Sequence, residues 1–189
     1  TYPGLTAFGI GSSIHLEVDR LSAVFLIIIS LIAFSSTLFS VRYMSIYQQE
    51  TLSRFYPFLL FFFATVVAVV TTWDMLLFIV AWEIMTLTSF ALVIYEKRSA
   101  DSMRAGFRYF LTTHLATACM ILATIILYTR TAPSSMDFTA LRLALAGMLT
   151  NEPALAHLVL ALFFIGFATK AGVLPFGFWL PDAYPAAPT

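Results

Sequence analysis

The sequence predicts an all-α membrane protein, a polytopic bundle of about five transmembrane helices. Of its 189 residues, 60% are hydrophobic and only 11% are charged, whereas soluble domains carry about 25% charged residues. Five segments are long and apolar enough to cross a bilayer, which takes roughly 20 residues of helix. Runs such as FLIIISLIAF do not alternate polar and apolar residues, as the strands of a membrane barrel would. Helix is therefore expected, because lipid offers the backbone no hydrogen-bond partner.

Each predicted helix is bounded by a change from apolar to polar residues. The first ends before a basic interface, the second and third are separated by a short Trp-Asp linker, and the fourth follows a basic loop. The fifth contains a proline near its end, and we expect it to be broken there. The predicted helices are residues 21–41, 55–72, 75–95, 107–128 and 155–175.

The connections complete the predicted topology. The Trp-Asp linker makes the second and third helices a tight antiparallel pair. The longest connection, between the fourth and fifth helices, contains helical spacing over residues 138–149 and could lie along the outer surface. Asn151 is a candidate cap for the fifth helix, with Pro153 in its first turn. We treat residues 1–189 as a single membrane domain, a piece of a longer protein truncated at both ends.

The basic residues predict an orientation. One side of the predicted bundle carries three of them, and the other side carries six. Because basic loops stay in the cytoplasm, the loop between the third and fourth helices is expected there, and the start of the first helix outside. The two sets are Arg20, Arg130 and Arg142 on one side, and Arg42, Arg54, Lys97, Arg98, Arg104 and Arg108 on the other.

Glu83 is the first candidate functional residue. It lies in FIVAWEIMTLTSF, and the nearest charged residues along the chain are Asp74 and Glu96. At about 1.5 Å per residue it lies about 12 Å into its helix, too deep for a short side chain to reach water. Intramembrane ionisable residues usually mark transport pathways. Thr86 lies one turn further on the same face. The alternative is a protonated glutamate that only joins helices.

Lys170 is the second candidate, next to a predicted helix break. Pro175 removes a backbone donor, and Gly172 and Gly177 flank it. Helices broken at membrane depth line protein or water-filled cavities, and transporters bind ions there. Burial disfavours the charged form of a lysine, and a nearby carboxylate restores it. A lysine and a glutamate together could therefore switch between charged and neutral states. The alternative is a lysine that extends to the cytoplasmic interface.

The remaining polar residues are weaker candidates. His114 is either a proton relay, since histidine titrates near neutral pH, or a neutral histidine bonded within the bundle. Arg104 and Arg108, with Tyr109 following, resemble an interface anchor. His157 is expected to be structural, and His15 is uninformative.

Several classes of function are unsupported by the sequence. The formal net charge of zero gives no reason to expect nucleic acid. A lone cysteine, Cys119, excludes an internal disulfide. No glycine-rich phosphate loop and no Cys/His cluster with metal-ligand spacing is present. No nucleophile–base pair is visible, so we expect no catalytic residue, no metal site and no catalytic centre in this chain.

Three motifs carry a family resemblance. WEIMTLTSFALVIY, RYFLTTHLATA and FATKAGVLPFGFWLPDAYPAAPT resemble the antiporter-like membrane subunit family. This family supplies proton-translocating subunits to NADH:quinone oxidoreductase (complex I), Mrp-type cation/proton antiporters and membrane-bound hydrogenases. The sequences of these motifs are most similar to the large membrane subunit of formate hydrogenlyase-type hydrogenases. The resemblance covers about residues 18–189.

The resemblance implies roles for three residues. Glu83 matches the helix-buried glutamate of the family, and Lys170 matches the lysine of the first broken helix. In the family these two form an electrostatic pair that gates proton uptake. His114 falls where hydrogenase-type members also have histidine. The five predicted helices match the first of two inverted repeats, so the second repeat and its ionisable residues lie outside this chain.

The function expected from the resemblance is that of a proton-translocating membrane subunit of a redox-driven complex, of the hydrogenase or NADH:quinone oxidoreductase type. The chain would bind no cofactor itself. Partner subunits would hold Fe–S clusters, with a Ni–Fe or flavin centre, and the expected partners are membrane subunits, peripheral redox subunits, lipid, and protons or Na⁺. The expected location is the bacterial or archaeal inner membrane. The alternatives are a stand-alone Mrp-type Na⁺/H⁺ antiporter subunit and a non-pumping anchor of the redox complex.

Overall fold

The computed structural model describes residues 6–7, 12–46, 52–95 and 100–187. Apart from two paired strands of two residues each, the regular elements among these residues are helices, which confirms the predicted all-α class. The elements in chain order are β1 (Thr6–Ala7), β2 (Ser12–Ser13), α1 (Arg20–Tyr43), the 3₁₀ helix η1 (Met44–Ile46), α2 (Leu52–Thr71), α3 (Met75–Val93), α4 (Ala100–Tyr128), α5 (Phe138–Asn151), α6 (Pro153–Ala171) and α7 (Leu180–Ala186).

Five of these helices, α1, α2, α3, α4 and α6, are long and apolar enough to cross a membrane. They are the five spans predicted from the sequence, with bounds that differ by a few residues. α4 begins at Ala100 rather than 107, because its polar first turns extend the helix beyond the apolar run. The predicted surface segment is α5, and Asn151 ends this helix instead of capping the next one. Glu152 occupies the cap of α6, with Pro153 following it.

The chain divides into two compact units, each with its own core. The first comprises Thr1–Glu17, Thr72–Val80 and Leu111–Leu180, and the second comprises Val18–Thr71, Ala81–Phe110 and Pro181–Thr189. The first core joins α3, α4, α5 and α6 through Met75, Ile79, Ala123, Leu127, Leu141, Met148, Ala156 and Val159.

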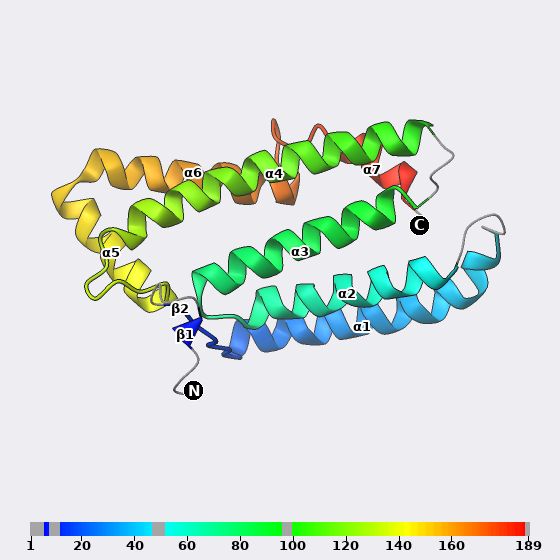
Figure 1. Cartoon of the computed structure of the whole chain (residues 1–189), viewed down its shortest axis with the longest axis horizontal. Coiled ribbons are helices and arrows are strands. Elements are labelled where there is room, and N and C mark those ends of the chain that lie inside the picture. Colours follow the sequence, from blue (N-terminus) through cyan, green and yellow to red (C-terminus); the bar gives the residue numbers. More distant parts are fainter. Residues whose placement is uncertain (1–5, 8–11, 47–51, 96–99, 188–189) are drawn as a thin grey trace. The chain divides into compact units, whose positions relative to one another are not determined.

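In the second unit, α1 and α2 lie side by side (Figure 1). Its core consists of Met44, Phe55, Leu59 and Tyr95, with the rings of Phe55 and Tyr95 in edge contact at 5.6 Å. Only one side chain of α1, that of Ser40, is buried. The apolar residues of α1 are therefore available to lipid or to further helices.

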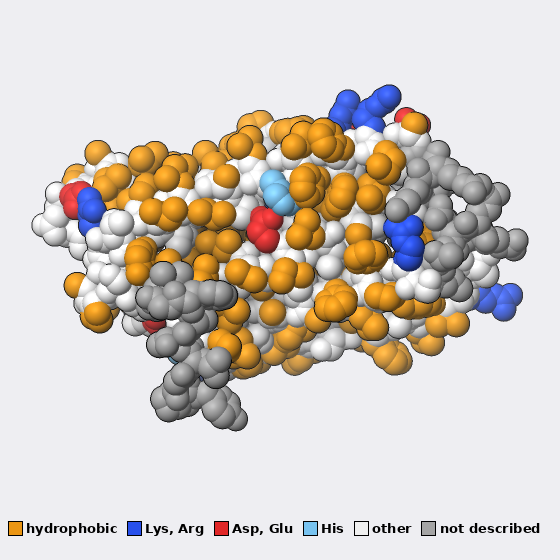
Figure 2. All heavy atoms as spheres, in the orientation of Figure 1, with side chains coloured by type: hydrophobic (Ala, Val, Ile, Leu, Met, Phe, Trp, Pro, Cys, Tyr) orange, Lys and Arg blue, Asp and Glu red, His pale blue; other side chains and the backbone are white. Residues whose placement is uncertain are grey.

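The surface of the molecule is largely apolar. Hydrophobic side chains are spread over the described part of the face shown in Figure 2, with few charged ones between them, and large exposed ones occur along every long helix. Soluble monomers rarely expose apolar patches of this extent. Together with the five spanning helices, this surface makes the chain a multi-pass membrane protein.

Small residues set the closest helix approaches. A Cβ atom on Gly166 of α6 would collide with the side chain of Met120 on α4 and would lie 3.2 Å from the carbonyl oxygen of Ala116. A Cβ atom on Gly106 of α4 would collide with Ile94 and would lie 3.3 Å from the ring of Phe90. Small residues at membrane helix contacts let backbones approach closely. Gly106 thereby fixes the spacing between α4 and the end of α3.

Candidate functional site

Glu83 lies near the middle of α3, which spans Met75–Val93. At about 1.5 Å per residue it is about 12 Å from the start of the helix and about 15 Å from its end. Its side chain is partly buried, and its Oε1 atom is fully covered by protein. Thr86, one turn further, is completely buried. The structure therefore places Glu83 at mid-helix depth on a face that packs against protein.

A tyrosine on α4 contacts this face of α3. The hydroxyl oxygens of Ser89 and Tyr109 are 2.6 Å apart, and either can be the donor. The Thr86 hydroxyl also interacts with the Tyr109 phenol, and the Glu83 carboxylate acts on it electrostatically. Glu83, Thr86 and Ser89 follow one another at intervals of three residues, so α3 presents all three side chains on one face.

The predicted interface anchor is wrong for one of its three residues. Tyr109 is only 4% exposed, because its ring points into the helix contact rather than toward the membrane surface. The neighbouring Arg108 does lie at the surface, and its Nη1 atom donates to Asp182 Oδ2 of α7 at 2.6 Å. This ion pair connects the start of α4 to the short helix that follows the break. Arg104 is exposed.

Lys170 is the penultimate residue of α6 and is partly buried. A cation in the last turn interacts favourably with the negative end of the helix dipole. α6 ends because Gly172 adopts the left-handed conformation at φ 73°, and its N–H bonds back to the Thr169 carbonyl at 3.2 Å. The N–H of Val173 bonds to the Ala168 carbonyl at 2.9 Å. Lys170 thus lies within the glycine-terminated last turn.

The break in the last spanning helix is present, but Pro175 does not end the helix. The sequence predicted a break next to Lys170, and α6 does stop at Ala171, four residues before the proline. Glycine in the left-handed conformation ends the helix first. Pro175 lies in the series of turns between α6 and α7, where its ring and missing N–H are tolerated.

The turns after Gly172 fold back against the end of α6. The indole Nε1 of Trp179 donates to the Thr169 carbonyl at 2.9 Å in a buried contact. Gly177 lies against the backbone of Gly172 so closely that a Cβ atom on Gly177 would overlap the Gly172 carbonyl. Gly172 and Gly177 are therefore both required by backbone geometry at the break.

His114 lies on α4 and is partly buried. It belongs to the first compact unit together with Lys170, whereas Glu83 belongs to the second. The structure brings Glu83 together with Thr86, Ser89 and Tyr109, and Lys170 together with the turns at Gly172 and Gly177. The predicted pairing of Glu83 with Lys170 and the predicted relay role of His114 stay predictions. His157 is exposed.

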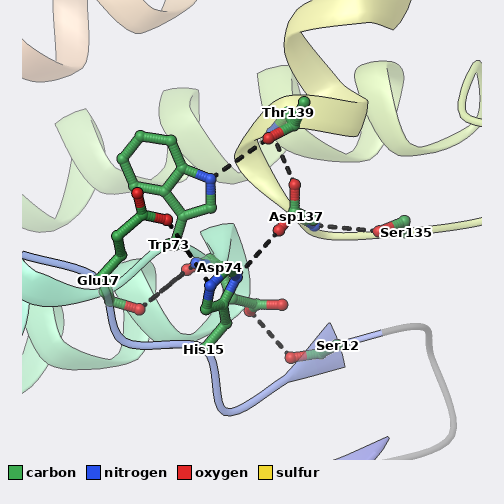
Figure 3. A network of polar contacts seen from close by, with 9 residues as sticks. Ser12, His15, Glu17, Trp73, Asp74, Ser135, Asp137 and Thr139 are labelled. Atoms are coloured by element: carbon green, nitrogen blue, oxygen red, sulfur yellow. Dashed lines mark hydrogen bonds and ion pairs between the residues drawn. The ribbon is translucent and has the colours of Figure 1, made fainter. Parts of the chain in front are cut away.

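A polar network that the sequence did not predict joins three distant segments of the first unit (Figure 3). The Ser12 hydroxyl donates to Asp74 Oδ1 at 2.9 Å, and the same carboxylate oxygen accepts from the N–H of Leu77 at the start of α3. Asp74 is 1% exposed. One buried carboxylate thereby caps α3 and holds the segment that precedes α1.

His15 and Asp137 form the second half of this network. His15 Nδ1 is 3.2 Å from Asp137 Oδ2, and His15 Nε2 is 3.7 Å from Glu17 Oε2. Burial acts to raise the pKa of Asp137, but hydrogen bonds from the Thr139 N–H and from His15 outweigh it and hold that pKa below its ordinary value. Trp73 Nε1 donates to the Thr139 hydroxyl at 3.3 Å.

The network constrains the membrane topology. Backbone bonds join Trp73 N–H to the His15 carbonyl at 2.8 Å and Met75 N–H to the Met136 carbonyl at 2.8 Å. Two long helices, α1 and α2, separate His15 from Trp73, and two more, α3 and α4, separate Met75 from Met136. An even number of crossings returns the chain to the same side. The three segments therefore meet on one side if each long helix spans the membrane once.

Among the described residues, His, Cys, Asp and Glu side chains form no group of three or more that could hold a metal ion. Cys119 is a free, partly buried thiol on α4. The chemistry that these residues can perform is proton binding and hydrogen bonding, by carboxylates, hydroxyls, one lysine and histidines.

The helices and the intramembrane ionisable residues define a class, the polytopic membrane proteins with a buried glutamate and a broken last span. Comparison with known families is more specific. The family described as "NADH:quinone oxidoreductase/Mrp antiporter, TM" matches residues 72–189, and "NADH-Ubiquinone oxidoreductase (complex I), chain 5 N-terminus" matches residues 5–56. The chain belongs to this antiporter-like membrane subunit family.

One curated relative and two solved structures show what the chain is similar to. The chain is 34% identical over 178 residues to hydrogenase-4 component B of Escherichia coli (strain K12), covering 94% of this chain and 25% of the relative. It superimposes with a TM-score of 0.72 and 26% identity on a chain of the Mrp complex from Dietzia sp. DQ12-45-1b, covering 89% of this chain and 30% of that one. It superimposes with a TM-score of 0.80 and 22% identity on a chain of an archaeal membrane-bound sulfane sulfur reductase, covering 91% of this chain and 34% of that one. The chain thus spans a quarter to a third of these proteins.

Proposed function

We propose that the full-length subunit containing this chain translocates protons across a bacterial or archaeal inner membrane as part of a redox-driven complex. The complex is of the formate hydrogenlyase/hydrogenase type or of the NADH:quinone oxidoreductase type. Membership of the antiporter-like family and the similarity to a hydrogenase component support this proposal. The observation that carries it is Glu83, a partly buried carboxylate near the middle of a spanning helix that acts electrostatically on the Tyr109 hydroxyl.

The proposed mechanism couples Glu83 to Lys170. Redox chemistry in partner subunits, at Fe–S clusters with a Ni–Fe or flavin centre, changes the field or the conformation around Glu83. At an effective dielectric constant near 20, two unit charges about 6 Å apart interact by roughly 3 kcal/mol. A change of this size is sufficient to move a proton on or off Lys170. The turns from Gly172 to Trp179 supply irregular backbone beside Lys170, where water can carry the proton onward.

The position of Lys170 supports this mechanism in one further respect. Lys170 lies in the last turn of α6, between the Thr169 carbonyl, which accepts from Trp179, and the left-handed Gly172. The backbone from which the lysine side chain extends is therefore held at the break by hydrogen bonds to the Thr169 carbonyl.

The test is proton uptake by inverted vesicles that carry the complete complex, with redox turnover and assembly measured in the same samples. We compare the wild type with Glu83→Gln and Lys170→Gln, and we use Glu152→Gln as a matched control at an exposed position. Uptake lost in the first two variants and retained in the control supports the mechanism. Unchanged uptake per turnover in Glu83→Gln and Lys170→Gln would leave these residues as structural.

A Na⁺/H⁺ antiporter subunit is the second candidate, and the similarity to a chain of an Mrp complex favours it. The same vesicles distinguish it from the redox-driven candidate. Antiport predicts Na⁺-dependent proton movement in the absence of any electron donor, whereas redox-driven translocation predicts uptake only during turnover. A non-pumping anchor predicts that Glu83→Gln reduces assembly and leaves coupling unchanged.

A further inference from the structure

A line of hydroxyl groups leads from Glu83 toward one end of α3. Thr86 and Ser89 follow Glu83 on the same helix face, and Tyr109 of α4 places its hydroxyl 2.6 Å from that of Ser89. Steps of three residues correspond to about 4.5 Å along the helix axis. A single water molecule can bridge hydroxyls at such spacing. The step between Tyr109 and Ser89 is therefore direct, and each step along α3 would need a bridging water molecule.

The geometry at Ser89 suits proton transfer. The Ser89 hydroxyl donates to the Thr86 carbonyl at 2.9 Å and shares its other contact with the Tyr109 hydroxyl. To pass a proton toward Glu83, Ser89 would accept from Tyr109 and turn its own hydrogen away from the Thr86 carbonyl, to a water molecule that lies between Ser89 and the next group of the line. Tyr109 and Thr86 are 4% and 0% exposed, and Glu83 and Ser89 are partly buried. Protein therefore covers the hydroxyl groups at the centre of the line.

The packing around the line keeps the two hydroxyls together. Gly106 lies one turn before Tyr109 on α4, and a side chain there would collide with Ile94 and press on Phe90. The rings of Phe90 and Phe110 are in contact at 5.0 Å. These contacts fix the distance between α3 and α4 beside Ser89 and Tyr109. The hydroxyl contact is therefore a product of rigid packing and not of a mobile surface group.

We infer that Ser89 and Tyr109 form a hydroxyl relay that delivers protons to Glu83 from the end of the bundle where α3 ends and α4 begins. This inference rests on the proposed function. The basic residues place that end in the cytoplasm, so the relay is the uptake side of the path. Ser102, a buried residue two turns before Tyr109 on α4, continues the line toward that end. The relay moves protons only, and no group in it needs to carry a lasting charge.

The relay is tested with Tyr109→Phe, Ser89→Ala and Ser89→Thr in the complete complex. Two matched controls remove a buried hydroxyl outside the line: Tyr95→Phe in the second core, and Thr88→Val, whose hydroxyl bonds within α3. Uptake by inverted vesicles is measured at equal assembly in H₂O and in D₂O. The sensitivity of uptake to D₂O is a readout that loss of a purely structural hydrogen bond would not change.

The relay predicts that Tyr109→Phe and Ser89→Ala each slow proton uptake by about tenfold or more. We expect Ser89→Thr to restore uptake and both controls to retain it. The double variant is expected to be no slower than the slower single variant, because both residues serve one path. In the variants that remove a relay hydroxyl, the solvent isotope effect is expected to differ from that of the wild type.

Two results would overturn the relay. If Tyr109→Phe and Ser89→Ala assemble normally and take up protons at the wild-type rate while Glu83→Gln does not, the hydroxyl pair only joins α3 to α4. If the wild type takes up no protons, or Glu83→Gln takes them up normally, the proposed function fails and the relay fails with it. Should Tyr109→Phe fail to assemble, proton uptake by Ser89→Ala is compared with uptake by Ser89→Thr. Equal uptake by these two variants would overturn the relay.

Discussion

The indole of Trp179 donates its hydrogen bond to the carbonyl of Thr169, ten residues earlier and directly before Lys170. This bond closes the turns that follow α6 onto the end of the helix. It gives a second donor to a carbonyl that also accepts the N–H of Gly172. A buried contact between a tryptophan and a backbone oxygen therefore adds to the cap bonds that hold the local shape of the broken helix.

Trp179→Phe removes this bond and keeps an aromatic ring. We expect the variant to be destabilised by about 1 kcal/mol, because the Thr169 carbonyl loses one of its two donors and keeps the N–H of Gly172. The measurement is thermal unfolding of the full-length subunit in detergent. Trp73→Phe is the control, since Trp73 makes an exposed bond of 3.3 Å to Thr139 and its loss is expected to cost less. Equal costs for the two variants would contradict this ranking.

Gly172→Ala is expected to destabilise the break. At φ 73° an alanine is strained, and its Cβ atom would collide with the side chain of Leu180. The strain alone costs about 1–2 kcal/mol. Gly147→Ala is the matched control: Gly147 lies in α5 with open space around it, so alanine there is expected to be neutral or stabilising by up to about 1 kcal/mol. Thermal unfolding of both variants checks this, and a stabilised Gly172→Ala would show that residue 172 is not held in the left-handed conformation.

Asp137→Asn tests the pH dependence of the polar network. Because the pKa of Asp137 in the folded protein lies below its ordinary value of 3.8, its carboxylate stabilises the fold above that pH, and this stabilisation is lost as the pH falls through the lowered pKa. Asparagine is also a good helix cap, so the substitution isolates the charge.

The wild type is expected to be more stable than Asp137→Asn at neutral pH. The difference is expected to be less than about 1 kcal/mol, because Asp137 and its partner His15 are partly exposed. The difference is expected to vanish in acid. Apparent melting temperatures measured in parallel from about pH 7 down to about pH 3 follow this difference. A difference that grows as the pH falls would contradict the sign of the pKa shift.

Asp182→Asn tests the ion pair with Arg108. The two side chains are 39% and 58% exposed, so the pair is expected to contribute at most about 1 kcal/mol. Salt screens exposed charges, with a Debye length of about 3 Å at 1 M. The loss of stability in Asp182→Asn is therefore expected at low ionic strength and absent at high ionic strength. A loss that persists in high salt would mean that the pair is shielded from solvent in the assembled subunit.

The sequence predicted the helices well because their cause is local. A run of apolar residues is sufficient to predict a span, and α3 begins at Met75 as expected because the polar Trp-Asp linker precedes it. The end of α6 was predicted four residues too late, since two helix-ending residues lie close together and a sequence does not say which acts first. Gly172 ends the helix by its backbone conformation, which only the structure shows.

The candidate site was predicted in part. Glu83 and Lys170 could be recognised because an isolated charge in an apolar helix is visible in the sequence. The contact of Ser89 with Tyr109 could not be predicted, because it depends on how α3 packs against α4, and Tyr109 next to two arginines was interpreted as an interface residue. His15 and Asp137 are 122 residues apart, so no local pattern connects them, and His15 was judged uninformative for that reason.

The polar network of Ser12, His15, Asp74 and Asp137 also has a consequence for biogenesis. Its last member is synthesised after the four long helices that precede it, and its segments can meet only if all of them arrive on the same side of the membrane. A nascent chain with α3 or α4 left uninserted would have Asp74 and Asp137 on opposite sides, and one with α1 or α2 left uninserted would separate Ser12 and His15 from Asp74. The hydrogen bonds of the network therefore stabilise only chains in which α1 to α4 are correctly inserted, and they can form before α6 is complete.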